Sequence, residues 1–242
     1  MTRPILILRN VSRENPGLIE ILLKENKLEY QIIDFDNSIL IDAIENYSAL
    51  IVLGGPDSAN DLTLKMQNEF TLIRRAIQSQ IPYLGICLGL QTLVKAMGGT
   101  VEKCQTTETG FRDIKNKFFN VKLTSKGRKD KLFKNLPDNL TVFQLHGETV
   151  KLTPQMTLLA TGDLCKNQIV KIGKTAYGIQ PHFELTNDLL ESWIIEDSDL
   201  QKLNAEQLRS DFKTIKSDYQ NMGRQLFSNF LTIAGLINTT NA

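Results

Sequence analysis

Short apolar runs alternate with longer amphipathic segments through the first half of the chain. Runs that predict strands lie at Pro4–Leu8, Glu29–Phe35, Ala49–Gly55 and Pro82–Cys87. The third run is continuous, as is typical of a strand buried on both faces. Between the runs, apolar positions on one helical face predict helices over 17–27, 64–79 and 88–97. This alternation predicts an α/β fold with a mostly parallel central sheet flanked by helices.

Shorter strands are expected between residues 100 and 179, after which the pattern becomes helical. The runs "FFNVKLT", "LTVFQLH", "TLLATG", "QIVKIG" and "TAYGIQ" predict an antiparallel or mixed extension of the same sheet. Beyond Thr186, amphipathic segments predict a helical tail. Because no Pro/Gly/Ser linker and no internal repeat divides the chain, we predict one domain over 1–186 and a C-terminal helical extension over 187–242 that packs on the same domain.

The composition is that of an ordinary globular protein. The chain of 242 residues is 41% hydrophobic and 23% charged, with a formal net charge of +1. Without a basic excess we expect no nucleic-acid partner, and without a long apolar run or a leader-like N-terminus we expect no membrane partner. Three cysteines with no C-x-x-C pair argue against a disulfide or zinc framework. We therefore predict a cytoplasmic protein that uses no metal and no cofactor.

A cysteine between two glycines marks the end of the fourth apolar run. In "YLGICLG", Gly85, Cys87 and Gly89 form the pattern G-x-C-x-G between a predicted strand and a predicted helix. This pattern is typical of a nucleophile elbow, in which glycines let strand and helix approach closely around a strained turn. The thiol then lies at the carboxyl edge of the sheet and at a helix N-terminus, which favours the reactive thiolate. The alternative, a buried structural cysteine, needs no flanking glycines.

A cysteine nucleophile needs a histidine, and the chain has only two. His182 follows a predicted strand in "YGIQPHFELT", and Glu184 comes two residues later. On an extended segment such residues point the same way, with Cα atoms roughly 6.5 Å apart, so the carboxylate can orient the imidazole. The alternative is an ordinary loop histidine beside a solvated glutamate.

The segment "VLGGPDSAND" is the third candidate for chemistry. Two glycines at the end of a buried strand allow backbone N–H groups to face a ligand, which an oxyanion hole requires. Taken alone, the segment is equally well explained as a simple Gly-Pro turn.

In this order the motifs resemble those of the class I (triad-type) glutamine amidotransferases, in particular free-standing members similar to the glutaminase domain of GMP synthetase. The resemblance covers nearly the whole chain. It includes G-G-P, the elbow G-I-C-L-G-x-Q, "FQLHGE", the final H-x-E and "LFSNFL" in the tail. The elbow and H-x-E at this separation are the specific signals. The resemblance implies a flavodoxin-like catalytic domain that hydrolyses glutamine through a Cys-His-Glu triad.

The resemblance also implies roles for single residues. Cys87 would attack the side-chain amide carbon of glutamine, giving a γ-glutamyl thioester and ammonia. His182 would protonate the leaving ammonia and then activate water, with Glu184 holding its ring. The residues implied in the oxyanion hole are Gly55 and Leu88, and those implied in substrate binding are Gln91, Leu145, His146 and Gly147.

The sequence departs from the family pattern near the expected pocket. Family members usually carry proline after the histidine, whereas here Pro181 precedes His182 and Phe183 follows it. Asp57 stands where relatives usually have an apolar residue. A carboxylate beside an oxyanion hole would raise the pKa of the thiol or repel an anionic substrate. The second histidine, His146, is expected to form part of the pocket wall rather than to act as the base.

Three functions remain open. The segment after Glu184 is too short for an ATP-using synthetase domain. The chain is then either an amidotransferase subunit that supplies ammonia to an unidentified synthetase or acceptor enzyme, or a stand-alone γ-glutamyl hydrolase or peptidase acting on another γ-glutamyl amide. The third function is that of an inactive binding protein with the same fold, against which the intact Cys-His-Glu set argues. A homodimer is also left open.

Overall fold

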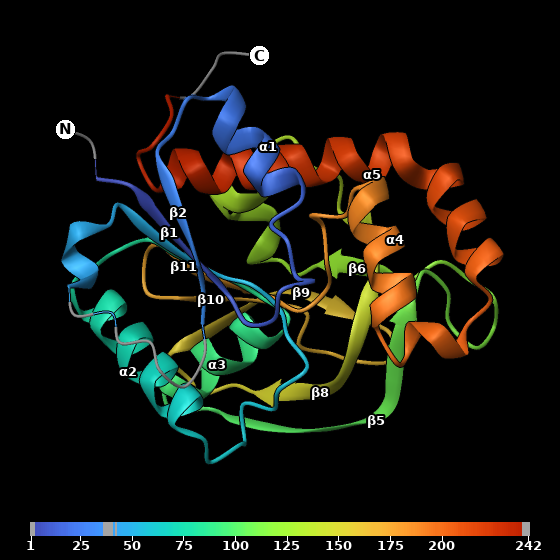
Figure 1. Ribbon diagram of the computed structural model, residues 1–242, viewed down its shortest axis with the longest axis horizontal. Coiled ribbons are helices and arrows are strands. Elements are labelled where there is room, and N and C mark those ends of the chain that lie inside the picture. The colour runs from blue at the N-terminus through green and yellow to red at the C-terminus, as the bar shows by residue number, and fades with distance from the viewer. Residues whose placement is uncertain (1–2, 36–40, 42, 239–242) are drawn as a thin grey trace.

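The computed structural model describes residues 3–35, 41 and 43–238, and it has a central sheet with helices on both sides (Figure 1). The helices are α1 (Leu18–Glu25), α2 (Leu64–Gln78), α3 (Leu88–Ala96), α4 (Asn187–Glu196) and α5 (Ala205–Ile233). The strands are β1 (Ile5–Arg9), β2 (Tyr30–Asp34), β3 (Ala49–Val52), β4 (Tyr83–Ile86), β5 (Thr100–Gly110), β6 (Asn120–Leu123), β7 (Asn139–Thr141), β8 (Gln144–Lys151), β9 (Met156–Gly162), β10 (Ile169–Ile172) and β11 (Ala176–Ile179). The predicted α/β fold is confirmed.

Nine strands form the central sheet in the order β2-β1-β3-β4-β11-β10-β9-β6-β7. The strands from β2 to β11 in this order run parallel to one another. The remaining four, β10, β9, β6 and β7, pair antiparallel. The predicted mixed extension therefore belongs to the same sheet, and the parallel half brings the ends of β1, β3, β4 and β11 to one edge.

A second, two-stranded sheet is formed by β5 and β8, which pair antiparallel. The prediction of one strand over "LTVFQLH" is wrong, because β7 joins the central sheet whereas β8 begins at Gln144 and pairs with β5. The strand β5 was not predicted at all. Its residues are mostly polar and exposed, so they lack the alternation that signals a half-buried strand.

Alternate residues of the central strands pack on opposite faces of the sheet. Ile5 and Ile7 of β1 belong to a core shared with α1 and α5, whereas Leu6 and Leu8 belong to a core shared with α2 and α3. All four side chains are at most 1% exposed. Burying one such side chain stabilises the fold by about 1.5–3 kcal/mol. Burial on both faces explains why these strands appear in the sequence as continuous apolar runs.

Polar side chains cap the N-termini of three helices. Thr63 caps α2, Thr186 caps α4 and Asn204 caps α5, and each side-chain oxygen accepts a hydrogen bond from a backbone N–H three residues later. From its cap, α5 runs along the α1 side of the sheet (Figure 1), where Leu226 and Phe227 are buried in the same core as α1. The C-terminal helix therefore shares its core with the sheet.

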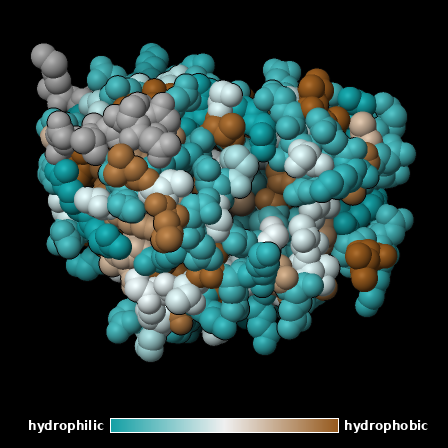
Figure 2. Space-filling model, turned by 60° about the horizontal axis from the view of Figure 1, so that its bottom comes forward, coloured by the Kyte–Doolittle hydropathy of each residue, from teal (hydrophilic) through white to brown (hydrophobic). Residues whose placement is uncertain are grey.

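The surface is mostly hydrophilic on the face shown in Figure 2, where apolar residues stand in small groups separated by polar ones. This is the ordinary distribution for a surface in contact with water. Within the described part of the chain, no helix combines the length and the apolar character needed to cross a bilayer.

Candidate active site

The chain turns sharply at Cys87, between β4 and α3. This residue has φ 51° and ψ −104°, a conformation that non-glycine residues rarely adopt. A Cβ at Gly85 would lie 2.2 Å from the carbonyl oxygen of Gly89, and a Cβ at Gly89 would lie 2.3 Å from that of Val52. Because only glycine fits at either position, the G-x-C-x-G pattern is explained by close packing around a strained cysteine.

The Cys87 thiol is buried and has two polar neighbours. It donates to the carbonyl oxygen of Leu145 at 3.6 Å, and it accepts from Gln180 Nε2 at 3.6 Å. The residue also directly precedes α3, so the partial positive charge of the helix N-terminus acts on the sulfur. These contacts hold the thiol at the carboxyl edge of the parallel strands.

His182 and Glu184 form a buried pair just after β11. The ring Nδ1 of His182 lies 2.5 Å from Glu184 Oε1, and Glu184 Oε2 accepts from the backbone N–H of Phe183 at 2.9 Å. Burial opposes a charge on the ring, but the Glu184 carboxylate and the Cys87 thiol outweigh it and raise the pKa of His182 well above 6.5. The other ring nitrogen, Nε2, is buried without a hydrogen-bond partner in the described part of the chain. This nitrogen is therefore available to a ligand.

Neighbouring elements fix the backbone and the ring of His182. Its N–H donates to the carbonyl oxygen of Phe143 at 2.9 Å, and its carbonyl oxygen accepts from the Tyr219 hydroxyl of α5 at 2.7 Å. Its ring meets the Trp193 ring of α4 edge-on, with centroids 4.7 Å apart. The imidazole thus has little freedom to leave its place.

Cys87 and the imidazole of His182 both lie beside Gly54. A Cβ at this position would lie 3.3 Å from His182 Cε1 and 3.5 Å from Cys87 Cβ, and 3.2 Å from Glu14 Oε2. The missing side chain of Gly54 therefore leaves room for three functional groups to converge. The structure brings together the cysteine and the histidine that the two sequence motifs predict.

Of the two predicted oxyanion-hole residues, one lines the same cavity and the other directly follows Cys87. Gly55 lines the cavity, and Leu88 follows Cys87 at the start of α3. Among the residues that the structure describes, neither backbone N–H donates a hydrogen bond. Both N–H groups are therefore free to bind a ligand oxygen, as the predicted role requires.

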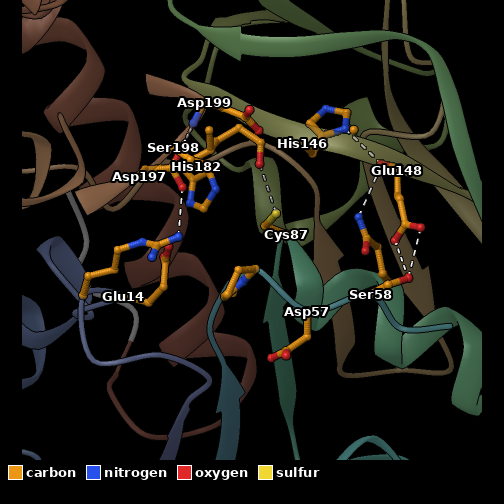
Figure 3. A pocket seen from close by; sticks show the side chains of 16 residues that line it. Glu14, Asp57, Ser58, Cys87, His146, Glu148, His182, Asp197, Ser198 and Asp199 are labelled. Atoms are coloured by element: carbon orange, nitrogen blue, oxygen red, sulfur yellow. Dashed lines mark hydrogen bonds and ion pairs between the residues drawn. The ribbon is translucent and has the colours of Figure 1, made fainter. Parts of the chain in front are cut away.

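A cavity of about 290 Å³ opens in front of Cys87 and His182 (Figure 3). Its volume is at the lower end of the usual range for small-molecule pockets, ~300–1,000 Å³, and suits a ligand the size of an amino acid. The charged residues that line it are Arg13, Glu14, Asp57, Glu148, Asp197 and Asp199. Acidic side chains thus dominate the lining, which favours a ligand that presents N–H groups.

The predicted substrate-binding residues Gln91, Leu145, His146 and Gly147 also line this cavity. The Gln91 side chain is tied to the wall, because its Nε2 donates to Gln180 Oε1 and to the carbonyl oxygen of Glu148, each at 3.3 Å.

The His146 ring is held by Glu108, with Nε2 and Oε2 2.9 Å apart. Both side chains of this pair are almost completely buried. The His146 ring is thus bound to Glu108, whereas the His182 ring lies with Cys87 beside Gly54.

Asp57, the departure expected to disturb the thiol, is paired with a lysine. Its carboxylate lies 2.6 Å from Lys65 Nζ, which also donates to the carbonyl oxygen of Asn10 at 2.9 Å. The Asp57 side chain is 34% exposed, so solvent weakens its field further. The positive charge of Lys65 offsets the effect that the sequence alone suggests for this carboxylate.

Two residues meet at the site although no motif marks them. Glu14 lies in the loop after β1 and is only 4% exposed, and Gln180 contacts both the thiol and Gln91. The loop after a parallel strand is a usual place for ligand-binding residues, which is a weak signal for Glu14. Gln180 is fully buried directly after β11, and nothing in the sequence around it indicates a contact with the thiol.

Cys104 and Cys165 lie close to His146. One ligand atom from each of Cys104, His146 and Cys165 lies within 4.8 Å of the others. The three residues come from β5, β8 and the segment after β9, so sequence spacing conceals their proximity.

A family model described as glutamine amidotransferase class-I matches residues 17–200. The glutamine amidotransferase-like protein YfeJ of Salmonella typhimurium is 31% identical over 200 residues, which covers 78% of this chain and 80% of that protein. The glutamine-hydrolyzing GMP synthase of Bacillus subtilis is 33% identical over 156 residues. That match covers 62% of this chain but only 28% of the GMP synthase.

Solved structures have the same fold along nearly the whole chain. A glutamine amidotransferase from Thermotoga maritima aligns with a TM-score of 0.84 and 27% identity, covering 96% of this chain and 99% of that one. A glutamine amidotransferase from Methylobacillus flagellatus aligns with a TM-score of 0.86 and 23% identity, covering 96% of each chain. The second likeness concerns the fold alone.

Proposed function

This chain belongs to the class-I glutamine amidotransferase family, and on that basis we propose that it hydrolyses the side-chain amide of glutamine through a thioester at Cys87. The observation that carries the proposal is the meeting of Cys87 and His182 beside Gly54, with Glu184 on the far ring nitrogen. The ammonia released would pass to an acceptor that is not identified.

The proposed reaction begins with transfer of the Cys87 thiol proton to His182 Nε2 and attack of the resulting thiolate on the γ-carbonyl carbon. A C–S bond forms, and the oxygen takes up negative charge beside the N–H groups of Gly55 and Leu88. His182 gives its Nε2 proton to the amide nitrogen, the C–N bond breaks, and ammonia leaves. Glu184 holds the ring so that Nε2 faces the reacting atoms.

The second half of the reaction releases glutamate. Water adds to the thioester carbon and gives a proton to His182, the C–S bond breaks, and the thiolate is restored. On general magnitudes, one oxyanion donor contributes about 10²–10³ to turnover and a proton-transfer group about 10²–10⁴.

A stand-alone γ-glutamyl hydrolase is the second candidate function. The acidic lining of the cavity favours it, because such a lining accommodates the amine part of a γ-glutamyl amide. Both functions use the same residues and the same thioester, and they differ in the group that leaves.

The test measures ammonia, amine and glutamate release by the purified protein, given L-glutamine and, separately, a panel of γ-glutamyl amides. The Cys87→Ser variant serves as the blank, since the change is nearly isosteric and the hydroxyl is far less nucleophilic at neutral pH. We expect release by the wild type and none by the variant, with the same circular dichroism for both. Turnover that survives in Cys87→Ser contradicts the mechanism. A tenfold preference for one substrate, about 1.4 kcal/mol in the transition state, decides between the two functions.

A further inference from the structure

Glu14 is a buried carboxyl group at the edge of the catalytic cavity. It lies in the loop after β1, is 4% exposed and lines the same cavity as Cys87 (Figure 3). Among the described residues, no side chain or backbone N–H donates a hydrogen bond to its carboxylate. A buried carboxylate without a donor is costly, so an unoccupied acceptor at this place points to a ligand that supplies the donor.

The position of Glu14 relative to the reacting groups is defined by Gly54. A Cβ placed at Gly54 would lie 3.2 Å from Glu14 Oε2, 3.3 Å from Cε1 of the His182 ring and 3.5 Å from Cys87 Cβ. One oxygen of Glu14, one ring nitrogen of His182 and one oxygen of Glu184 also lie within 4.8 Å of one another. The nitrogen that departs in the proposed reaction must approach His182 to receive its proton. Glu14 therefore borders the path of the leaving nitrogen.

We propose that Glu14 forms the leaving-group subsite, in which its carboxylate accepts a hydrogen bond from the N–H of the departing ammonia or alkylamine. The assignment rests on the proposed function, because it concerns the same amide cleavage. It adds a substrate class: amides whose leaving nitrogen carries N–H hydrogens, namely glutamine and γ-glutamyl alkylamines. Glu14 moves no proton in this scheme; it stabilises the positive charge that develops when His182 protonates the nitrogen.

The environment of Glu14 brings the pKa of its carboxyl group close to neutral pH. Burial raises its pKa to about 7; His182 and Arg13 lower the pKa, whereas Glu184 and Asp197 raise it. Arg13 is itself paired with Asp197 at 2.9 Å, so it offers little compensation to Glu14. A cationic nitrogen in the subsite would favour the ionised carboxylate. The benefit of Glu14 to amide cleavage should therefore increase between about pH 6 and pH 8.

The test compares two substrates that share the γ-glutamyl group and form the same thioester. The leaving group of L-glutamine is ammonia. The leaving group of L-glutamate γ-methyl ester is methanol, which has no N–H to donate. His182 must protonate both leaving groups, so a change in His182 affects both. Only a residue that contacts N–H hydrogens separates the two values of kcat/KM.

The variants are Glu14→Gln, which removes the charge, and Glu14→Met, which also removes the acceptor. Glu69→Gln is the matched control, because Glu69 is another buried carboxyl group without a donor and does not line the cavity. We expect kcat/KM for glutamine at pH 8 to fall about tenfold or more in Glu14→Met and less in Glu14→Gln. The value for the ester should change by less than about threefold, and Glu69→Gln should leave the ratio of the two substrates unchanged.

An equal loss for both substrates would show that Glu14 only supports the shape of the cavity, and an unchanged glutamine rate would show that it has no part in the reaction. Either result overturns the assignment. Failure of the proposed function gives a different pattern, since the wild type would then release no more product from either substrate than Cys87→Ser.

Discussion

Glu69 on α2 is a fully buried carboxyl group, and its burial leads to a quantitative prediction about the pH dependence of stability. The residue is 0% exposed, and neither carboxylate oxygen has a hydrogen-bond partner in the described part of the chain. Burial is the main reason that its pKa rises from 4.5 to about 7. The neighbouring side chains of Thr92, Lys65 and Asn10 oppose the rise, and the charge of Asp57 adds to it. The folded chain therefore keeps a proton that the unfolded chain releases.

The sign and size of the effect follow from proton linkage. Between about pH 4.5 and pH 7 the folded state binds more protons than the unfolded state, so the free energy of unfolding falls as pH rises. One such group changes it by about 1.4 kcal/mol per pH unit, or about 3 kcal/mol over this interval. Replacing Glu69 with Gln removes the titration and keeps the side-chain volume.

The assay is urea unfolding of wild type and Glu69→Gln at several pH values from 5 to 8. The single tryptophan, Trp193, is fully buried and reports unfolding by its fluorescence. We expect the difference in unfolding free energy, variant minus wild type, to rise by about 2.5 kcal/mol between pH 5 and pH 8. The comparison does not depend on the fixed cost of a buried amide, because that cost is the same at every pH. A difference that stays constant with pH would refute the reasoning.

Two further variants examine the site. Glu184→Gln removes the carboxylate that favours the charged form of His182, so the pKa of His182 should fall. We expect kcat to drop by about 10²–10⁴, measured as a pH–rate profile. A loss of kcat below about threefold would contradict the proposed role of Glu184. Asp57→Met removes one contact of Lys65 and a negative charge from the cavity. We expect KM for an anionic γ-glutamyl substrate to fall and the free energy of unfolding to drop by about 1 kcal/mol. Unchanged KM values across a substrate panel would show that Asp57 has no effect on substrate binding.

The parts of the site that the sequence predicts are those in which neighbouring residues determine the geometry. Gly85 and Gly89 are required by contacts within one strand–turn–helix unit, so their spacing identifies the elbow. His182 and Glu184 face each other because they are two residues apart on extended backbone, which the 2.5 Å contact confirms. In both cases the residues next to one another in the sequence are sufficient to predict the local geometry.

The parts that the sequence does not predict depend on contacts between distant segments. Glu14 reaches the cavity only because β1, β3, β4 and β11 end at one edge of the sheet. The charge of Asp57 is offset by Lys65, the second residue of α2, which the sequence motif does not include. The strand β5 is held by pairing with β8 rather than by an apolar face, so its residues carry no strand signal.

The C-terminal helix contacts the backbone of His182, the histidine proposed to be catalytic, and we propose that residues 187–238, the described part of the predicted extension 187–242, belong to the same folding unit as the sheet. Three contacts join α5 to the H-x-E segment. Tyr219 donates to the carbonyl oxygen of His182 at 2.7 Å, and Gln220 Nε2 donates to that of Leu185 at 3.2 Å. A Cβ at Gly223 would lie 2.3 Å from the carbonyl oxygen of Phe183, so helix and segment are in direct backbone contact. Removing the helix would expose the core, and a smaller change is needed to test its role.

Tyr219→Phe is that change, because it deletes one hydroxyl and keeps the ring that stacks on Phe183. The carbonyl oxygen of His182 then loses its donor, which should lower the unfolding free energy by about 1–3 kcal/mol and lower kcat several-fold with little change in KM. Tyr177→Phe is the matched control: Tyr177 is equally buried, and its hydroxyl donates to Asp130 at 3.0 Å, outside the cavity that Cys87 and His182 line. We expect the control to lose stability and to keep kcat, as measured by glutamate release and urea unfolding on the same preparations. If both variants lose kcat in proportion to their stability, α5 supports the fold in general and not the position of His182.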